Sequence, residues 1–163
     1  MQDRYKKKDQ LIRELAALRR QFADLESAEQ QRKKLEAELQ DSKDYLNKII
    51  NSISDPIFVK DSKHRLVLVN DAECILAGRS REELIGKTDY DFFPKEQVDI
   101  FWQKDDEGLE RGSEDINEEE ITDALGNKRV IVTKKNLYID KAGNRFIVGI
   151  IRDMNERKSS EQA

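Results

Sequence analysis

Phe146-Ile-Val-Gly-Ile-Ile-Arg-Asp-Met-Asn-Glu-Arg-Lys158 is the stretch that decides the fold of this chain. It opens with an apolar run that contains one glycine, as in a strand of a small folded domain. The charged residues that follow have helical potential, so the predicted strand, residues 145–153, leads directly into a polar helical segment. We therefore expect a domain whose last strand continues into a connecting helix.

The other strands are predicted from apolar runs upstream of this one. They lie at residues 57–60, 65–70, 116–122 and 128–139. Short helices fall between the second and third strands, and one begins with a capping box in which Ser80 precedes Glu83 by three residues. A longer helix is expected between Pro94 and Gly112. This order predicts an α+β domain with a five-stranded antiparallel sheet and short helices on one face.

Three turns share one frame, which begins with aspartate and ends with a residue that accepts a positive φ angle. They are Asp61-Ser-Lys-His64, Asp123-Ala-Leu-Gly126 and Asp140-Lys-Ala-Gly143. Aspartate accepts hydrogen bonds from its own turn, and glycine adopts left-handed geometry without strain. The only histidine of the chain, His64, takes the glycine position in the first turn. We expect it to be an exposed turn residue and not a metal or haem ligand.

The first 53 residues contain neither glycine nor proline and are rich in helix-forming residues. Their apolar side chains recur with the 3.5-residue period of a coiled-coil seam. The seam consists of Leu11, Leu15, Leu18, Phe22, Leu25, Leu35, Leu39, Leu46 and Ile49. A helix of this length cannot bury its seam against one small domain, so we expect a homodimer through this helix, with parallel and antiparallel arrangements both open.

Composition excludes several classes of protein. The chain has 163 residues, a net charge of −4 and one cysteine. Residues 1–50 sum to +2 and residues 51–163 to −6, so neither part is basic enough to predict nucleic-acid binding. One cysteine permits no disulfide within the chain, and no apolar run approaches the roughly 18–20 residues that cross a bilayer. We expect a cytoplasmic location and no membrane contact within this chain.

Five blocks of sequence, in this order, resemble the PAS family. They are Asp55-Pro-Ile-Phe-Val-Lys-Asp61, Leu66-Val-Leu-Val-Asn70, Gly78-Arg-Ser-Arg-Glu-Glu-Leu-Ile-Gly-Lys87, Asp89-Tyr-Asp-Phe-Phe-Pro94 and Gly149-Ile-Ile-Arg-Asp-Met-Asn-Glu-Arg-Lys158. One block alone is weak, but the ordered set is specific. The resemblance implies the PAS fold, a pocket between sheet and helices, dimerisation through flanking helices, and sensing in a bacterial or archaeal signalling protein. Such proteins are most often histidine kinases and next diguanylate cyclases.

The resemblance also implies an organisation and a signal exit. Residues 1–45 are expected to form a coiled-coil signalling helix, 46–155 the PAS sensor domain, and 156–163 the start of an output linker helix. The exit is placed at Asp153 and Asn155, although the family usually has threonine at the second position. The expected partner is an effector domain of the parent protein, a histidine kinase first, so the chain is cytoplasmic or the cytoplasmic part of a membrane sensor.

Neither common chromophore of the family is favoured. PAS domains with covalent flavin carry a Gly-x-Asn-Cys-Arg-Phe-Leu-Gln block near the long helix, whereas Cys74 lies earlier. The glutamine that reads the flavin is replaced by Ile151. Haem-binding members take a histidine from the long helix, and residues 94–111 contain none. The cofactor is therefore unknown, and binding of a small molecule stays open.

The candidate pocket is lined by apolar residues of the helices and the last two strands. It consists of Phe93, Phe101, Trp102, Val132, Ile147, Gly149 and Ile151. By similarity, Ile147, Gly149 and Ile151 face the helices, and the residues between them face outward. A domain of this size also needs such side chains as plain core. Gly149 is the strongest indication, because a missing side chain admits either a ligand or the Trp102 ring.

The sequence contains no recognisable catalytic or metal site. A Ser/His/Asp set, a cysteine and histidine cluster for zinc, and a glycine-rich phosphate loop are all missing. The acidic runs 105–107 and 118–120 are interpreted as solvated faces and not as an acid–base pair. Lys134 and Lys135 must point to opposite faces of their strand. One of them is a candidate to bind a carboxylate ligand, with an ion pair to residues 118–120 as the simpler interpretation.

Two functions remain, and neither is enzymatic. The first is a sensory module that dimerises and relays a small-ligand or conformational signal through its flanking helices to an effector outside this chain. The second is a ligand-free domain that serves only as a dimerisation, interaction and spacer module. A cavity in the core favours the first function, whereas a fully packed interior favours the second.

Overall fold

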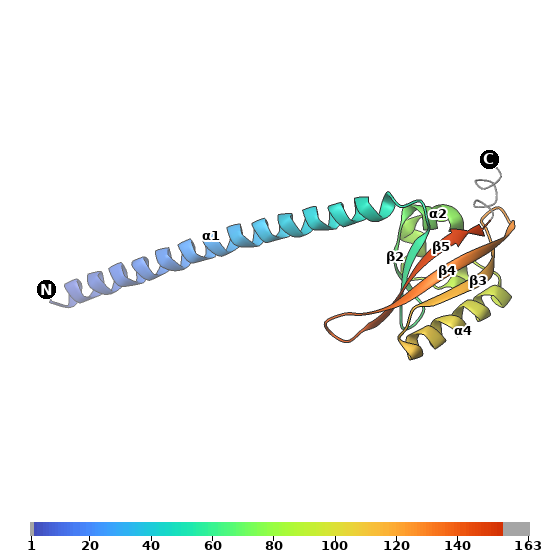
Figure 1. Ribbon diagram of the computed structural model, residues 1–163. Coiled ribbons are helices and arrows are strands. Elements are labelled where there is room, and N and C mark those ends of the chain that lie inside the picture. Colours follow the sequence, from blue (N-terminus) through green and yellow to red (C-terminus); the bar gives the residue numbers. More distant parts are fainter. Residues whose placement is uncertain (1, 155–163) are drawn as a thin grey trace. The chain divides into compact units, whose positions relative to one another are not determined.

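A long helix precedes an α+β domain in the computed structural model, which describes residues 2–154 (Figure 1). By their internal contacts the residues form two units, Met1–Leu46 and Asn47–Ala163. The expected output linker at 156–163 and the exit residue Asn155 lie outside the described residues.

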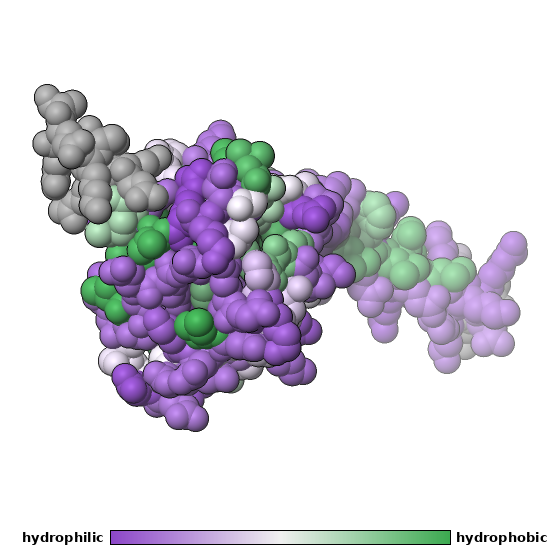
Figure 2. All heavy atoms as spheres, turned by 90° about the vertical axis from the view of Figure 1, so that its right-hand side faces the viewer, coloured by the Kyte–Doolittle hydropathy of each residue, from purple (hydrophilic) through white to green (hydrophobic). Residues whose placement is uncertain are grey.

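Helix α1, Gln2–Asn51, is continuous, as expected from a stretch without glycine or proline. Its seam side chains are all exposed in the single chain, from 41% for Ile49 to 68% for Leu25. Hydrophobic side chains are visible along the helix surface in Figure 2. No helix within residues 2–154 is both long and apolar enough to span a bilayer.

Five strands form one antiparallel sheet, which confirms the predicted fold class. They are β1 (Ile57–Asp61), β2 (Leu66–Val69), β3 (Asp115–Thr122), β4 (Lys128–Ile139) and β5 (Arg145–Asp153). Their order in the sheet is β2-β1-β5-β4-β3, so the last strand of the sequence lies at the centre. The central strand pairs with β1 on one side and β4 on the other. Both edges of β5 are therefore hydrogen-bonded to neighbouring strands.

The helices cover one face of this sheet. They are α2 (Asp71–Ala77), α3 (Arg81–Leu84), the 3-10 turn η1 (Asp89–Asp91) and α4 (Lys95–Arg111). The predicted capping box is confirmed, because the Ser80 hydroxyl accepts from the Glu83 amide and the Glu83 carboxylate accepts from the Ser80 amide. Helix α4 follows Pro94 and ends at Gly112, whose φ of 67° is left-handed.

The three Asp-initiated turns have the predicted backbone geometry, with φ of 60° at His64, 82° at Gly126 and 86° at Gly143. The predicted exposure of the His64 side chain is wrong, since the residue is only 6% exposed. Its ring stacks on Trp102 of α4, with ring centroids 4.0 Å apart. The turn pattern predicted the backbone conformation at His64. It could not show that Trp102 of α4 covers the His64 side chain.

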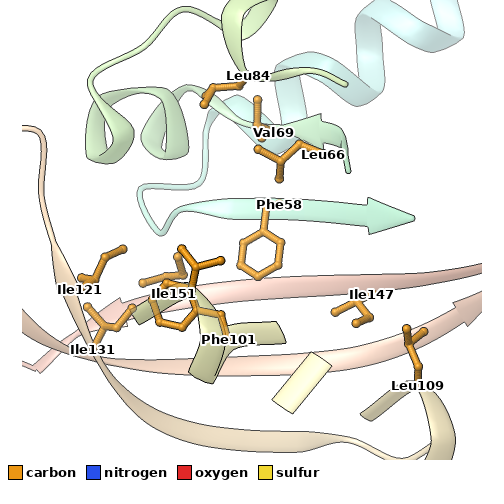
Figure 3. Packing of buried hydrophobic residues seen from close by; sticks show 11 residues of the cluster. Phe58, Leu66, Val69, Leu84, Phe101, Leu109, Ile121, Ile131, Ile147 and Ile151 are labelled. Carbon is orange, nitrogen blue, oxygen red and sulfur yellow. The ribbon is translucent and has the colours of Figure 1, made fainter. Parts of the chain in front are cut away.

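The core lies between the sheet and α2, α3 and α4. Figure 3 shows Phe58 of β1, Ile151 of β5 and Phe101 of α4 pointing toward one another. Burial alternates along β5, where Ile147, Gly149 and Ile151 are buried and the residues between them are half-buried. This is the inward face predicted for the strand. The Phe58 ring occupies the space beside Gly149, so neither a ligand nor the Trp102 ring does.

Candidate functional site

A cavity of about 30 Å³ lies among the inward side chains of the sheet and helices. This volume suits one or two groups the size of a water molecule. Its apolar wall is formed by Phe58, Leu66, Phe93, Phe101, Ile121, Ile131 and Ile151. Its polar wall is formed by Lys60, Glu73, Asp89, Glu119, Thr133 and Lys135. The cavity is therefore small and, for the interior of a small domain, unusually rich in charge.

The charged groups form a buried network that ties helices to strands. Lys60 of β1 donates to Asp89 of η1 at 2.5 Å and to Asp105 of α4 at 3.0 Å. Lys135 of β4 lies 2.7 Å from Asp105 and 3.3 Å from Glu119 of β3. None of these five residues is more than 7% exposed. Ion pairs and hydrogen bonds offset the large cost of taking such charges out of water.

For Lys60 and Asp105, burial and ion pairing shift the pKa in opposite directions, and the combined effect of ion pairing is the larger. Burial opposes the charged form of Lys60, but the carboxylates of Asp89 and Asp105 raise its pKa above the ordinary value. Burial opposes ionisation of Asp105 too, yet Lys60, His64 and Lys135 hold the pKa of that carboxyl well below its usual range. Both groups are therefore charged at neutral pH.

His64 extends the network toward the surface. Its Nδ1 lies 3.6 Å from Asp105 and its Nε2 lies 2.9 Å from Asp106. Burial opposes protonation, but the two carboxylates raise the pKa of His64 above its ordinary value. The ring therefore bridges the buried Asp105 and the exposed Asp106.

Glu73 of α2 differs from every other carboxylate in the cavity wall. It is 5% exposed, and within residues 2–154 its Oε2 has no hydrogen-bond partner. Burial and the nearby charge of Asp89 raise the pKa of Glu73 to about 7, against a smaller opposing effect of Lys60. Glu73 therefore changes its charge near neutral pH, inside a cavity.

The structure places the predicted pocket residues in different surroundings. Phe93, Phe101 and Ile151 line the cavity. Ile147 lines a second, smaller cavity of about 10 Å³ beside Asp105 and Lys135. Trp102 packs on His64, and Val132 is half-buried between two inward residues of β4.

Two interpretations of the acidic runs are corrected. Residues 105–107 and 118–120 were expected to be solvated, but Asp105 is fully buried and Glu119 is 7% exposed. Asp105 follows Phe101 by one helical turn and so shares its inward face. Lys135 is the inward lysine of its pair, bound to Glu119, whereas Lys134 forms an ion pair with Glu114.

Sequence reasoning missed Lys60, Glu73 and Asp89. Lys60 follows the buried Phe58 by two residues on β1, so strand alternation alone would have placed it inward. Glu73 carried no such signal, because a seven-residue helix shows too little periodicity to assign faces. Its burial depends on how α2 packs against the sheet.

The predicted exit residue, Asp153, ends β5 beside a surface groove. Its carboxylate accepts a hydrogen bond from Arg129 at 3.1 Å, and Arg129 also binds Asp123 at 2.8 Å. All three line a groove of about 300 Å³. Ile131 and Ile151 line both this groove and the internal cavity. Two side chains thus form a shared wall between the cavity and the groove.

At the same end of the sheet, where β1 begins beside the end of β5, Asn70 connects α1 to the sheet. Its side-chain oxygen accepts from the amides of Ile57 and Glu73. Its side-chain nitrogen donates to the carbonyls of Ile50, Ile53 and Asp55, at 2.9–3.3 Å. One fully buried amide therefore joins the end of α1, the start of β1 and the first turn of α2.

Comparison with known proteins places this geometry in a family. Residues 44–154 match the family model described as PAS fold. The uncharacterized protein y4lL of Sinorhizobium fredii (strain NBRC 101917 / NGR234) is 40% identical over 118 residues, which are 71% of this chain and 14% of that protein. The chain thus spans a small part of that relative's length.

Two solved structures share the fold. The PAS domain of a two-component sensor histidine kinase is 20% identical with a TM-score of 0.59, covering 72% of this chain and 98% of that one. The PAS domain of an HTR-like protein from Haloarcula marismortui is 21% identical with a TM-score of 0.60, covering 75% and 99%. The family match includes the whole sheet, its helices and the charged cavity, and this chain belongs to the PAS family of sensory signalling domains.

Proposed function

We propose that this chain dimerises through α1 and relays a small-ligand or conformational signal from its cavity to an effector domain of the parent protein. The observation that carries the proposal is the shared wall at Ile131 and Ile151. Ile151 precedes Asp153 by two residues on the central strand, so a change in the cavity has a short path to the exit. Such a device needs two packing states with different ligand affinity.

The entry side supports the same proposal. Phe58 lines the cavity. The backbone amide of its neighbour Ile57 donates a hydrogen bond to the Asn70 side chain at 2.8 Å. Asn70 in turn donates to the carbonyl of Ile50 in the last turn of α1 and to that of Ile53 just after the helix. Motion of β1 is therefore coupled to α1 through one buried side chain.

A sensor histidine kinase is the proposed effector. The support is the likeness to a PAS domain from such a kinase, together with the signalling-helix pattern of α1. A diguanylate cyclase is the second candidate for this role.

The exposed seam of α1 supports dimerisation. Nine large apolar side chains at coiled-coil spacing are between 41% and 68% exposed in the single chain. Burying a leucine is worth about 1.5–3 kcal/mol, so a second copy would gain substantially by covering this seam. A homodimer would cover the apolar seam of α1 without any other partner protein.

The alternative, a ligand-free spacer, is favoured by one specific observation. The cavity holds only about 30 Å³, and most of its charged groups already pair with one another. The spacer and the sensor share the dimer, so they differ only in whether occupancy of the cavity matters.

Sedimentation velocity of the whole chain tests the dimer. Wild type is expected to sediment as a dimer, and the double variant Leu35→Asp, Leu39→Asp as a monomer, because each charge would be buried in the seam. The matched control is Lys34→Asp, Glu38→Lys, which changes charges beside the seam and should remain dimeric. A monomeric wild type at micromolar concentration would overturn the proposal.

A further inference from the structure

Glu73 is a polar group in the cavity that packing does not explain. An unpartnered buried carboxylate oxygen costs free energy, and structures retain such a group when something else satisfies it. Oε2 of Glu73 is unpartnered within residues 2–154, and the residue lines the cavity together with Asp89. The cavity is thus arranged around an acceptor that lacks a donor.

The charges around the cavity do not supply that donor. Lys60 is shared by Asp89 and Asp105, and Lys135 by Asp105 and Glu119. Glu73 is the fourth carboxylate of this set, which holds two ammonium groups and the contact of His64 with Asp105, so negative charge is still in excess. A cation with N–H donors would correct both deficits, whereas an anion would worsen the charge balance.

We propose that the cavity binds a protonated primary amine, whose ammonium group donates to Glu73 and Asp89. This inference rests on the proposed sensory function, for which it names the ligand class. The volume of about 30 Å³ fits an ammonium or methylammonium ion without rearrangement. A longer alkyl group would require the apolar wall to move, and the Phe58 ring is the part of that wall that packs against Gly149.

Binding of the amine should depend on pH. Glu73 faces Asp89 from η1 and Lys60 from β1, and Glu119 of β3 and Lys135 of β4 lie in the same cavity wall. The pKa of Glu73 is raised to about 7, so the acceptor is mostly charged at pH 8 and mostly neutral at pH 6. Affinity for the cation should fall roughly tenfold over this range.

Thermal unfolding of the whole chain with defined salts tests the inference. At pH 8 methylammonium chloride is expected to raise Tm with saturation, relative to tetramethylammonium chloride at equal ionic strength. Tetramethylammonium has the same charge but no N–H donor, and potassium chloride controls for cation charge alone. Ammonium chloride is a further comparison. It has the N–H donors but no alkyl group to contact the apolar wall, so a larger Tm shift with methylammonium than with ammonium indicates that the site prefers an amine.

Two variants assign the effect to the cavity. Glu73→Gln keeps the volume, removes the charge, and should abolish the methylammonium shift. Glu82→Gln removes an exposed carboxylate of α3 and should keep it. Equal shifts with methylammonium and tetramethylammonium, or a full methylammonium shift in Glu73→Gln, would overturn the inference. Binding needs neither dimer nor effector, so a monomeric wild type would overturn the proposed function and leave this inference standing.

Discussion

The ammonium nitrogen of Lys135 lies 2.7 Å from a carboxylate oxygen of Asp105, and both side chains are buried between β4 and α4. This contact fixes the longest covering helix to the sheet by charge as well as by apolar packing. A buried ion pair contributes little net stability, but removing one partner leaves the other charge uncompensated. The relationship therefore makes the fold sensitive to single substitutions at either residue.

Lys135→Met should lower the free energy of unfolding by about 3–5 kcal/mol, because Asp105 and Glu119 would lose a shared cation. Urea denaturation measures the loss. Lys134→Met is the matched control, since its pair with Glu114 is exposed and should be worth about 1 kcal/mol or less. Similar losses at the two positions would contradict the assigned role of the buried network.

Stability should fall as pH rises from about 5 to about 7, because the pKa of Glu73 is raised to about 7 from an ordinary 4.5. In this window the folded state holds a proton that the unfolded state has lost, so raising the pH favours unfolding. The total effect is about 3 kcal/mol. Glu73→Gln should remove this slope and be more stable than wild type at pH 8.

Acid should act in a separate window. The pKa of Asp105 is held below its usual range, so its contribution is present at neutral pH and is lost as pH falls below about 4. Urea titrations at several pH values distinguish the two groups. His64, whose pKa is also raised, adds a loss of stability above about pH 6. A slope between pH 5 and 6 that survives in Glu73→Gln would therefore contradict the assignment to Glu73.

Asn70→Asp should destabilise the domain by about 2–4 kcal/mol and loosen its connection to α1. The acceptor for Ile57 and Glu73 is kept, but three carbonyls lose their donor and meet a carboxylate. Hydrogen exchange should show faster exchange around residues 50–57. Asn51→Asp, which keeps the side-chain acceptor used by Asp71 and Arg81, is the control and should change little.

Gly149→Ala should cost about 1–3 kcal/mol, because its Cβ would overlap three carbons of the Phe58 ring. Phe58→Leu in the same chain should recover part of this loss, giving a coupling energy between the two sites. Gly108→Ala on α4 has open space around the new methyl group and should be neutral or stabilising. Additive effects at positions 149 and 58 would refute the steric explanation.

Asp153→Ala should uncouple the output while changing stability by about 1 kcal/mol or less. Its partner Arg129 is 40% exposed by side chain and retains its ion pair with Asp123, so the substitution leaves no buried, unpaired cation. The measurement is signalling by the variant domain fused to its native output domain, alongside its melting temperature. Normal signalling would remove Asp153 from the relay.

The elements of the domain were largely predictable, because each depends on neighbours in sequence. Apolar runs gave the strands, the capping box at Ser80 gave one helix start, and the Asp-initiated turns gave the positive φ at His64. The candidate site was predicted only in its apolar part, at Phe93, Phe101 and Ile151. Its charged part was misjudged, because exposed and buried charges look alike in a sequence.

The sequence by itself determined the order of the elements and the apolar seam of α1, since these follow from local apolar runs and a period of 3.5 residues. Alternation showed that Ile147, Gly149 and Ile151 share one face of β5, and the family resemblance indicated that this face is the inward one. Only the tertiary structure decided that Lys60, Asp89 and Asp105, 45 residues apart at most, share one buried network. It also decided that Glu73 faces a cavity with a free acceptor oxygen among the described residues. A charge can be buried only where partners from other elements offset the loss of water, and those partners are brought together by packing.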